Sequence, residues 1–162
     1  MSAVMHAALR QQIAEMGRAL SPALFGGTRQ LYEKRMAPVD AALYRESRDC
    51  SYGPDERHVL DLFQLAEPGQ TSVAKPAAGA PIFVFVHGGG FVMGSKGGPD
   101  DIFYNNVGRW AARQGYVGVT LNYRLAPQHG YPAGIEDLAR AVDWLRDNAA
   151  RWGGDANAIV LS

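Results

Sequence analysis

The feature that most constrains the fold is the apolar run Pro81–Val86, which passes directly into His87 and three glycines, Gly88–Gly90. The run shows no alternation of apolar and polar residues, which is typical of a strand covered on both faces in a parallel sheet. A second apolar run, Tyr116–Leu121, has the same character. Ligands of open α/β sheets bind at the carboxyl ends of the strands, and the glycine loop would lie at that edge.

The wider pattern predicts two parts. Residues 1–40 carry apolar side chains at helical spacing, with Ser21-Pro22 opening a second helix and Pro38 ending it. Such a helical N-terminal segment either caps a site or merely covers the sheet. Residues 41–162 predict a hairpin followed by alternating strands and helices, which implies right-handed crossovers and a parallel sheet. The expected fold class is therefore α/β, with amphipathic helices preceding the first half of the core.

Each element of the second part has its own pattern. The predicted strands are 43–50, 58–65, 81–86, 116–121 and 158–161, and residues 67–81 read as a surface connection. One helix would be capped by Asp100 or Asp101 and bury the stripe Phe103, Val107, Trp110 and Ala111. The next would follow Pro132, bury Ile135, Leu138, Val142 and Leu145, and stop at Gly153-Gly154.

Composition excludes several classes of function. Lysine plus arginine and aspartate plus glutamate both total 16, so the formal net charge is zero and neither nucleic acid nor a membrane is an expected partner. The single cysteine, Cys50, favours a reducing compartment, and residues 1–20 lack the apolar core of a secretion signal. We expect a cytoplasmic protein without a metal, because no cluster of ligand residues has the required spacing.

The glycine loop allows three chemistries. A phosphate-binding P-loop needs Lys before Ser or Thr, whereas the order here is Ser95-Lys96. A dinucleotide fingerprint fails because Met93 stands where its last glycine should be. The third is an oxyanion hole, in which backbone N–H groups stabilise the charge that develops on a carbonyl oxygen during acyl transfer. Its esterase version is an HGGG loop after the third strand, which agrees with His87–Gly90.

These residues carry a family resemblance. His87-Gly88-Gly89-Gly90-Phe91 with Asn122-Tyr123-Arg124-Leu125-Ala126-Pro127 resembles the hormone-sensitive-lipase-like branch of the α/β-hydrolase carboxylesterases, and residues 131–137 resemble the segment before its long helix. The resemblance implies that the amides of Gly89 and Gly90 are oxyanion donors. It also implies that His87 and Gly88 shape the loop, and that Tyr123 and Arg124 belong to the scaffold.

The nucleophile of such an enzyme is a serine in a Gly-x-Ser-x-Gly elbow, and none of the serines here has that frame. The resemblance places the serine a few residues after Ser162, and the acid and histidine later still. No catalytic triad residue is therefore expected within the chain. His58 reads as a half-exposed strand residue and His129 as a solvated loop residue, while Asp100, Asp101, Glu136 and Asp137 read as helix caps.

The function expected is that of a serine carboxylic-ester hydrolase without a cofactor, acting on a small-molecule ester. This chain would supply the oxyanion loop, remain inactive alone, and need a companion C-terminal segment for the triad. Phe91 and Met93 are candidate pocket residues, although core packing explains them equally well. A formamidase or amidase of the same fold, or an inactive fragment used for interaction, are the alternatives.

Overall fold

The structure, a computed structural model, separates into two compact units, Met1–Val39 and Asp40–Ser162. It describes residues 3–36, 39–66 and 79–162. The predicted end of the second helix at Pro38 and most of the predicted connection 67–81 lie outside the described residues.

The first unit is a pair of helices, α1 (Ala3–Glu15) and α2 (Pro22–Glu33). Ser21 begins α2 as predicted, because its Oγ accepts a hydrogen bond from the Leu24 amide at 3.1 Å and Pro22 follows it. Outside α2, the Arg35 guanidinium reaches back to Gln12 of α1 at 2.9 Å.

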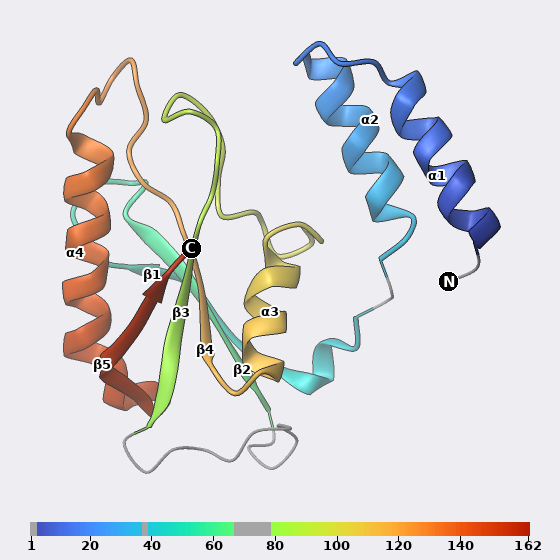
Figure 1. The fold of residues 1–162 in the computed structure, drawn as a ribbon. Coiled ribbons are helices and arrows are strands. Elements are labelled where there is room, and N and C mark those ends of the chain that lie inside the picture. The colour runs from blue at the N-terminus through green and yellow to red at the C-terminus, as the bar shows by residue number, and fades with distance from the viewer. Residues whose placement is uncertain (1–2, 37–38, 67–78) are drawn as a thin grey trace. The chain divides into compact units, whose positions relative to one another are not determined.

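The second unit is a mixed five-stranded sheet with a helix on each face (Figure 1). The strand order is β1-β2-β4-β3-β5, in which β1, β2 and β4 pair antiparallel while β4, β3 and β5 pair parallel. The elements are η1 (Ala41–Leu43), β1 (Tyr44–Ser51), β2 (Val59–Leu65), β3 (Ala80–Val86), α3 (Asn105–Arg113), β4 (Val117–Leu121), α4 (Ala133–Asn148), η3 (Ala149–Trp152) and β5 (Gly154–Leu161). The predicted α/β class and strand–helix alternation are confirmed.

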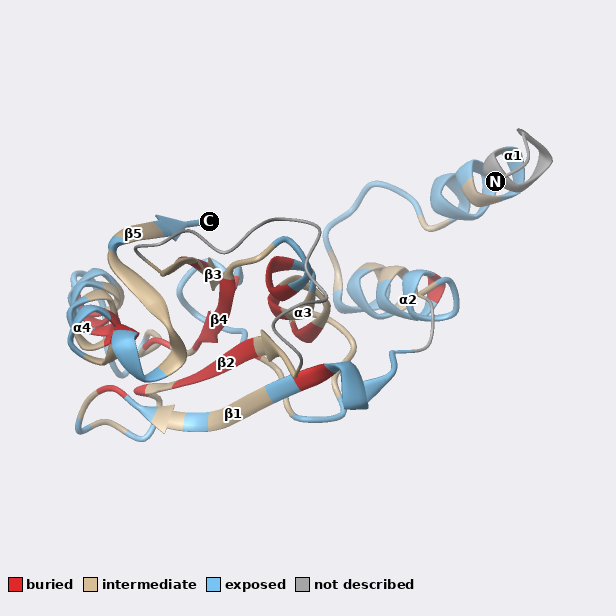
Figure 2. Cartoon of the chain, turned by 90° about the horizontal axis from the view of Figure 1, so that it is seen from below, coloured by how far each residue is buried: buried red, intermediate tan, exposed pale blue. Residues whose placement is uncertain are grey.

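The sheet is buried most deeply at its centre (Figure 2). Every residue of β4 is buried, as a strand without alternation predicts. In β3, Ile82 and Val84 are fully buried, whereas Phe83 is half-buried and packs edge-on against Trp110 of α3 at 5.6 Å. Helix α3 approaches β4 closely at Gly118, where a Cβ would lie 3.0 Å from the Gly108 Cα.

Helix α3 differs from the prediction. It begins at Asn105, so neither Asp100 nor Asp101 caps it, and the Asp101 carboxylate instead accepts the Gly98 amide at 3.0 Å. Trp110 of the predicted apolar stripe is exposed, because α3 lays its small residues on the sheet. Its buried residues are Asn105, Gly108, Ala111 and Ala112.

The buried face of α4 and the start of β5 also differ from the prediction. In α4 the buried line is Ala133, Asp137, Ala141 and Leu145. Ile135 of the predicted stripe is therefore exposed. Gly153 stops the preceding helical segment as predicted, with φ of 64°, but β5 begins at Gly154 rather than near 158. Pairing starts at once because Gly154 lies opposite Ala80 of β3.

Candidate active site

The loop after β3 projects from the carboxyl end of the sheet. His87 is buried, residues 88–95 are exposed, and Lys96 is buried again. The turn closes on the Gly89 carbonyl, which accepts the amides of Val92 and Met93 at 3.2 Å each. Gly89 has φ of 127°, and a Cβ there would lie 2.7 Å from the Met93 carbonyl carbon, so only glycine fits without a shift.

The amides of Gly89 and Gly90 are free to bind a ligand. Both residues are exposed, and within the described part of the chain neither N–H has a hydrogen-bond acceptor. Gly90 also has a positive φ, 62°, which belongs to the left-handed region. Two adjacent unpaired donors on a constrained turn are the arrangement that an oxyanion requires.

His87 holds the start of the loop rather than acting as a base. Its ring stacks on Tyr123, with ring centroids 4.3 Å apart and 14° between the planes, and its Nδ1 lies 2.8 Å from the Gly88 carbonyl. A carbonyl only accepts, so Nδ1 carries the proton. Burial lowers the pKa of His87, the hydrogen bond to Gly88 opposes this, and the charge of Arg57 adds to the lowering. The imidazole is therefore neutral, as a loop-shaping residue requires.

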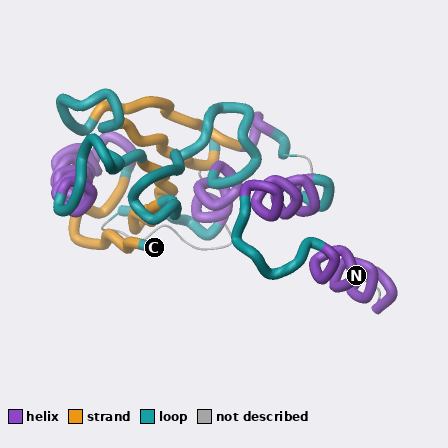
Figure 3. Tube along the Cα trace, turned by 90° about the horizontal axis from the view of Figure 1, so that it is seen from above, coloured by secondary structure: helices purple, strands orange, loops and turns teal. Residues whose placement is uncertain are grey.

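The loop after β4 is hydrogen-bonded to the loop of residues 87–95 after β3, the glycine loop, and both belong to the teal loop segments of Figure 3. The Tyr123 hydroxyl donates to the His87 carbonyl at 2.9 Å, and the Ala126 amide donates to the Phe91 carbonyl at 2.8 Å. The Lys96 amide donates to the Asn122 side chain at 2.6 Å. The segment 122–127 that accompanies the HGGGF motif in the sequence thus packs as its support.

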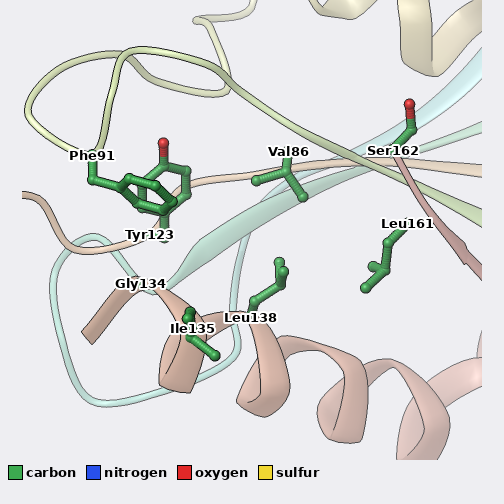
Figure 4. Close-up of a pocket in the computed structure, with 8 residues that line it drawn as sticks. All are labelled: Val86, Phe91, Tyr123, Gly134, Ile135, Leu138, Leu161 and Ser162. Carbon is green, nitrogen blue, oxygen red and sulfur yellow. The ribbon is translucent and has the colours of Figure 1, made fainter. Parts of the chain in front are cut away.

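A hollow of about 320 Å³ lies beside this loop, between α4 and the ends of β3 and β5 (Figure 4). Phe91 lines this hollow, whereas Met93 does not. Both residues are 59% exposed, so neither is packed in the core of the described residues. The lining is almost entirely apolar and consists of Val86, Phe91, Tyr123, Gly134, Ile135, Leu138, Leu161 and Ser162.

Strand β5 ends beside the start of the glycine loop. The Ser162 carbonyl accepts the Val86 amide at 2.8 Å, and the Ser162 amide donates to the Val84 carbonyl at 2.9 Å. Val86 immediately precedes His87, so residue 162 lies at the same sheet edge as the glycines.

Comparison with known proteins decides the family. Residues 72–162, more than half of the chain, match the BD-FAE family. The chain belongs to the BD-FAE family. The matched region contains β3, the glycine loop, α3, β4, α4 and β5.

Two curated relatives of this BD-FAE chain are named as esterases. It is 35% identical to esterase LipC of Mycobacterium tuberculosis over 80% of the chain and 30% of that protein. It is 40% identical to carboxylesterase NlhH of the same organism over 51% of the chain and 24% of that protein. The chain thus spans about a quarter to a third of these relatives. The resemblance to hormone-sensitive-lipase-like carboxylesterases is confirmed.

Solved structures show the same fold. Esterase B of Lactobacillus rhamnosis superposes with a TM-score of 0.64 over 96% of this chain and 45% of that one, at 23% identity. The esterase of Pyrobaculum calidifontis superposes with a TM-score of 0.58 over 99% of this chain and 47% of that one, at 25% identity. The chain therefore has the α/β-hydrolase fold.

Two buried ionic clusters support this BD-FAE core, and the first corrects two sequence interpretations. His58, expected to be half-exposed, is 2% exposed, with its Nε2 at 2.8 Å from the Asp137 carboxylate and its Nδ1 accepting the Asp55 amide at 3.1 Å. Asp137 caps no helix, because its carboxylate instead binds the Arg124 side chain and amide. Both ring nitrogens of His58 are engaged in hydrogen bonds, so His58 has a structural role and does not act as a base.

Sequence reasoning missed the second cluster. Lys96 is 6% exposed, and its Nζ lies 2.7 Å from Asp61 and 2.8 Å from Asp49. Asp61 is fully buried and also pairs with Arg48 at 2.8 Å. The Lys96 ammonium is thus committed to carboxylates, which removes it from any phosphate cradle. Asp61 in the middle of the apolar strand β2 was the available indication of a buried partner.

Two other kinds of site are absent from the described residues. No group of three or more His, Cys, Asp or Glu side chains is placed to hold a metal ion. No described helix combines the length and apolarity that crossing a bilayer demands.

Proposed function

We propose that this chain is the oxyanion-loop part of a serine carboxylic-ester hydrolase. The observation that carries the proposal is the pair of exposed, unpaired amides of Gly89 and Gly90, which lie at the carboxyl end of β3 where β5 also ends. The esterase names of the relatives support the same reaction class. The proposed site needs no metal or other cofactor.

In the proposed reaction, a serine oxygen attacks the acyl carbon of the ester while a histidine takes the serine proton. The carbonyl oxygen becomes an oxyanion and is bound by the amides of Gly89 and Gly90, joined by the amide that follows the serine. The histidine returns its proton to the departing alcohol, and water then hydrolyses the acyl-enzyme. His87 and Gly88 shape the loop. The apolar hollow beside Phe91 suits the apolar part of the ester.

The complete hydrolase, as we use the term, is this chain continued by the residues that supply serine, acid and histidine. We propose that the serine follows Ser162 closely, because β5 delivers that residue to the oxyanion loop. We propose the cytoplasm as its compartment, since the single Cys50 forms no internal disulfide.

The test is hydrolysis of short-chain p-nitrophenyl esters by the complete hydrolase, by residues 1–162 alone, and by a variant with the elbow serine replaced by alanine. We expect activity only in the unaltered complete hydrolase, and a fluorophosphonate adduct outside residues 1–162. Hydrolysis of the matching anilide faster than of the ester would indicate an amidase instead. Absence of both activities and of labelling would favour the inactive fragment used for interaction.

We further propose that the helical unit of residues 1–39 caps the site. Its large apolar residues Leu20 and Phe25 are 83% and 57% exposed, and exposed apolar surface of this kind suits contact with an apolar substrate. Removing residues 1–39 from the complete hydrolase should raise KM for long acyl chains more than for acetate. An equal effect on both esters would contradict the cap.

A further inference from the structure

Arg57 lies outside the glycine loop and outside the loop after β4, yet it binds both. It belongs to the turn between β1 and β2, where its own amide donates to the Asp55 carboxylate at 2.9 Å. Its Nε donates to the Tyr123 carbonyl at 2.7 Å, and its Nη2 donates to the Gly94 carbonyl at 2.9 Å. A single planar guanidinium thus joins the returning arm of the oxyanion loop to the segment that supports its start.

The returning arm touches the arm that carries the oxyanion amides. Gly94 has φ of 105°, and a Cβ there would lie 2.5 Å from both the Gly88 carbonyl oxygen and the His87 ring. The Met93 amide donates to the Gly89 carbonyl at 3.2 Å. Because the two arms lie against each other, a group that holds the Gly94 carbonyl in place also restricts the arm that carries Gly89 and Gly90.

The turn that carries Arg57 is itself fixed to the core. Its neighbour His58 is fully engaged between Asp137 and the Asp55 amide. The Tyr52 ring lies 5.0 Å from the His58 ring, and the Tyr52 hydroxyl donates to the Asn122 carbonyl. Arg57 therefore projects from a rigid base, which a positioning side chain needs.

Among the described residues, the Arg57 guanidinium has no competing ionic partner. Within the part of the chain that the structure describes, no carboxylate pairs with the Arg57 side chain, so its donors are directed at the two carbonyls. Burial is the main cause that lowers the pKa of His87, at the start of the loop, and the positive charge of Arg57 lowers it further.

We propose that Arg57 is a positioning residue for the oxyanion amides of Gly89 and Gly90. This inference rests on the proposed ester hydrolysis. Without Arg57, the Gly94 arm loses its outer support, and the Gly89 and Gly90 amides are held less firmly in place. A displacement of about 1 Å at a reacting group costs about 10²-fold in rate, so the effect should appear in kcat rather than in KM.

The test compares Arg57→Met and Arg57→Lys with Arg146→Met in the complete hydrolase, using p-nitrophenyl acetate. Arg146 is an exposed arginine of α4, with a side chain 57% exposed, and serves as the matched control. We expect Arg57→Met to lower kcat about 10²-fold with KM nearly unchanged. Arg57→Lys should lie between it and the unaltered protein, because an ammonium cannot bind both carbonyls in one plane. Guanidinium ion at millimolar concentration should restore part of the activity of Arg57→Met only.

A second readout follows the loop itself. The ¹⁵N–¹H resonances of Gly89 and Gly90 should shift in Arg57→Met and stay in place in Arg146→Met. Three results would each overturn the role of Arg57. The first is an unchanged kcat, and the second is unchanged Gly89 and Gly90 resonances. The third is a loss of activity that guanidinium ion does not restore and that matches a loss of folded protein. Absence of ester hydrolysis by the unaltered complete hydrolase would instead overturn the proposed function.

Discussion

Tyr123 contacts His87 twice, because its ring stacks on the imidazole at 4.3 Å and its hydroxyl donates to the His87 carbonyl at 2.9 Å. The Tyr123 side chain therefore contacts both the ring and the backbone of His87, the residue that starts the glycine loop. Burial raises the pKa of Tyr123, so the hydroxyl remains a proton donor at neutral pH. The tyrosine of the Asn122-Tyr123-Arg124 segment is thus a structural partner of the HGGG motif.

Tyr123→Phe separates the two contacts. Phenylalanine keeps the stacked ring, but the His87 carbonyl loses its donor, and a buried unpaired acceptor costs about 1–3 kcal/mol. We expect the complete hydrolase to lose about that much unfolding free energy in urea titrations, together with about tenfold in kcat. Tyr131→Phe is the matched control, since Tyr131 is 90% exposed. Equal behaviour of the two variants would show that the hydrogen bond holds nothing.

Gly89→Ala and Gly90→Ala should differ strongly although the residues are adjacent. At Gly89 the new methyl group would press on the Met93 carbonyl carbon at 2.7 Å, and φ of 127° strains any residue with a Cβ. At Gly90 nothing lies within 4 Å, so only the left-handed backbone conformation costs about 1–2 kcal/mol.

Steady-state kinetics on the complete hydrolase should show the contrast directly. Gly89→Ala should lower kcat by about 10²–10³, the usual effect of losing one oxyanion donor, while Gly90→Ala should lower it about tenfold or less. Thermal unfolding of both variants serves as the control for folding. A larger loss at Gly90 than at Gly89 would contradict the described turn.

Local patterns predicted what local chemistry decides. The unbroken apolar run 81–86 was sufficient to predict a buried parallel strand, and the glycines after His87 predicted a loop at its carboxyl end, where Gly89 and Gly90 have positive φ. Ser21-Pro22 likewise predicted the start of α2. In each case the residues of the pattern themselves carry the property that decides the structure: apolar side chains on both faces, the absence of a Cβ, or a capping hydroxyl.

Partnerships between distant residues could not be predicted in this way. Asp137 read as a helix cap, and Lys96 was considered only for a phosphate-binding loop. Only the folded chain brings Asp137 to His58 and Lys96 to Asp61. The cap of α3 failed for a related reason. Asp101 binds the Gly98 amide in the preceding turn, so the helix starts later.

Lys96→Met should destabilise the fold without touching the glycines. The methionine is similar in length and apolar, but it leaves the fully buried Asp61 with one cation fewer, and breaking a buried ion pair costs about 3–5 kcal/mol. Chemical denaturation of the complete hydrolase should show this loss. Lys34→Met, at an exposed lysine after α2, is the control and should change the unfolding free energy by less than about 0.5 kcal/mol. A loss of that small size at Lys96 would mean that the ion pair does not support the core.

Asp137 should make the fold sensitive to acid. Burial favours its neutral form, but hydrogen bonds from the Arg124 side chain and amide and from His58 outweigh this, so its pKa lies below the ordinary 3.8. A carboxyl whose pKa is lower in the folded state stabilises that state above its unfolded pKa. This stabilisation is lost as pH falls through the folded pKa.

Melting temperatures of the complete hydrolase and of Asp137→Asn should therefore be compared across pH. The difference between them should be largest and constant above about pH 5, and it should shrink progressively below that pH as the carboxylate is protonated. Asp143→Asn, at an exposed carboxylate of the same helix, should show no such dependence because its side chain is 74% exposed. If the difference for Asp137 stayed constant into strong acid, the ionised carboxylate could not be what holds His58 and Arg124 together.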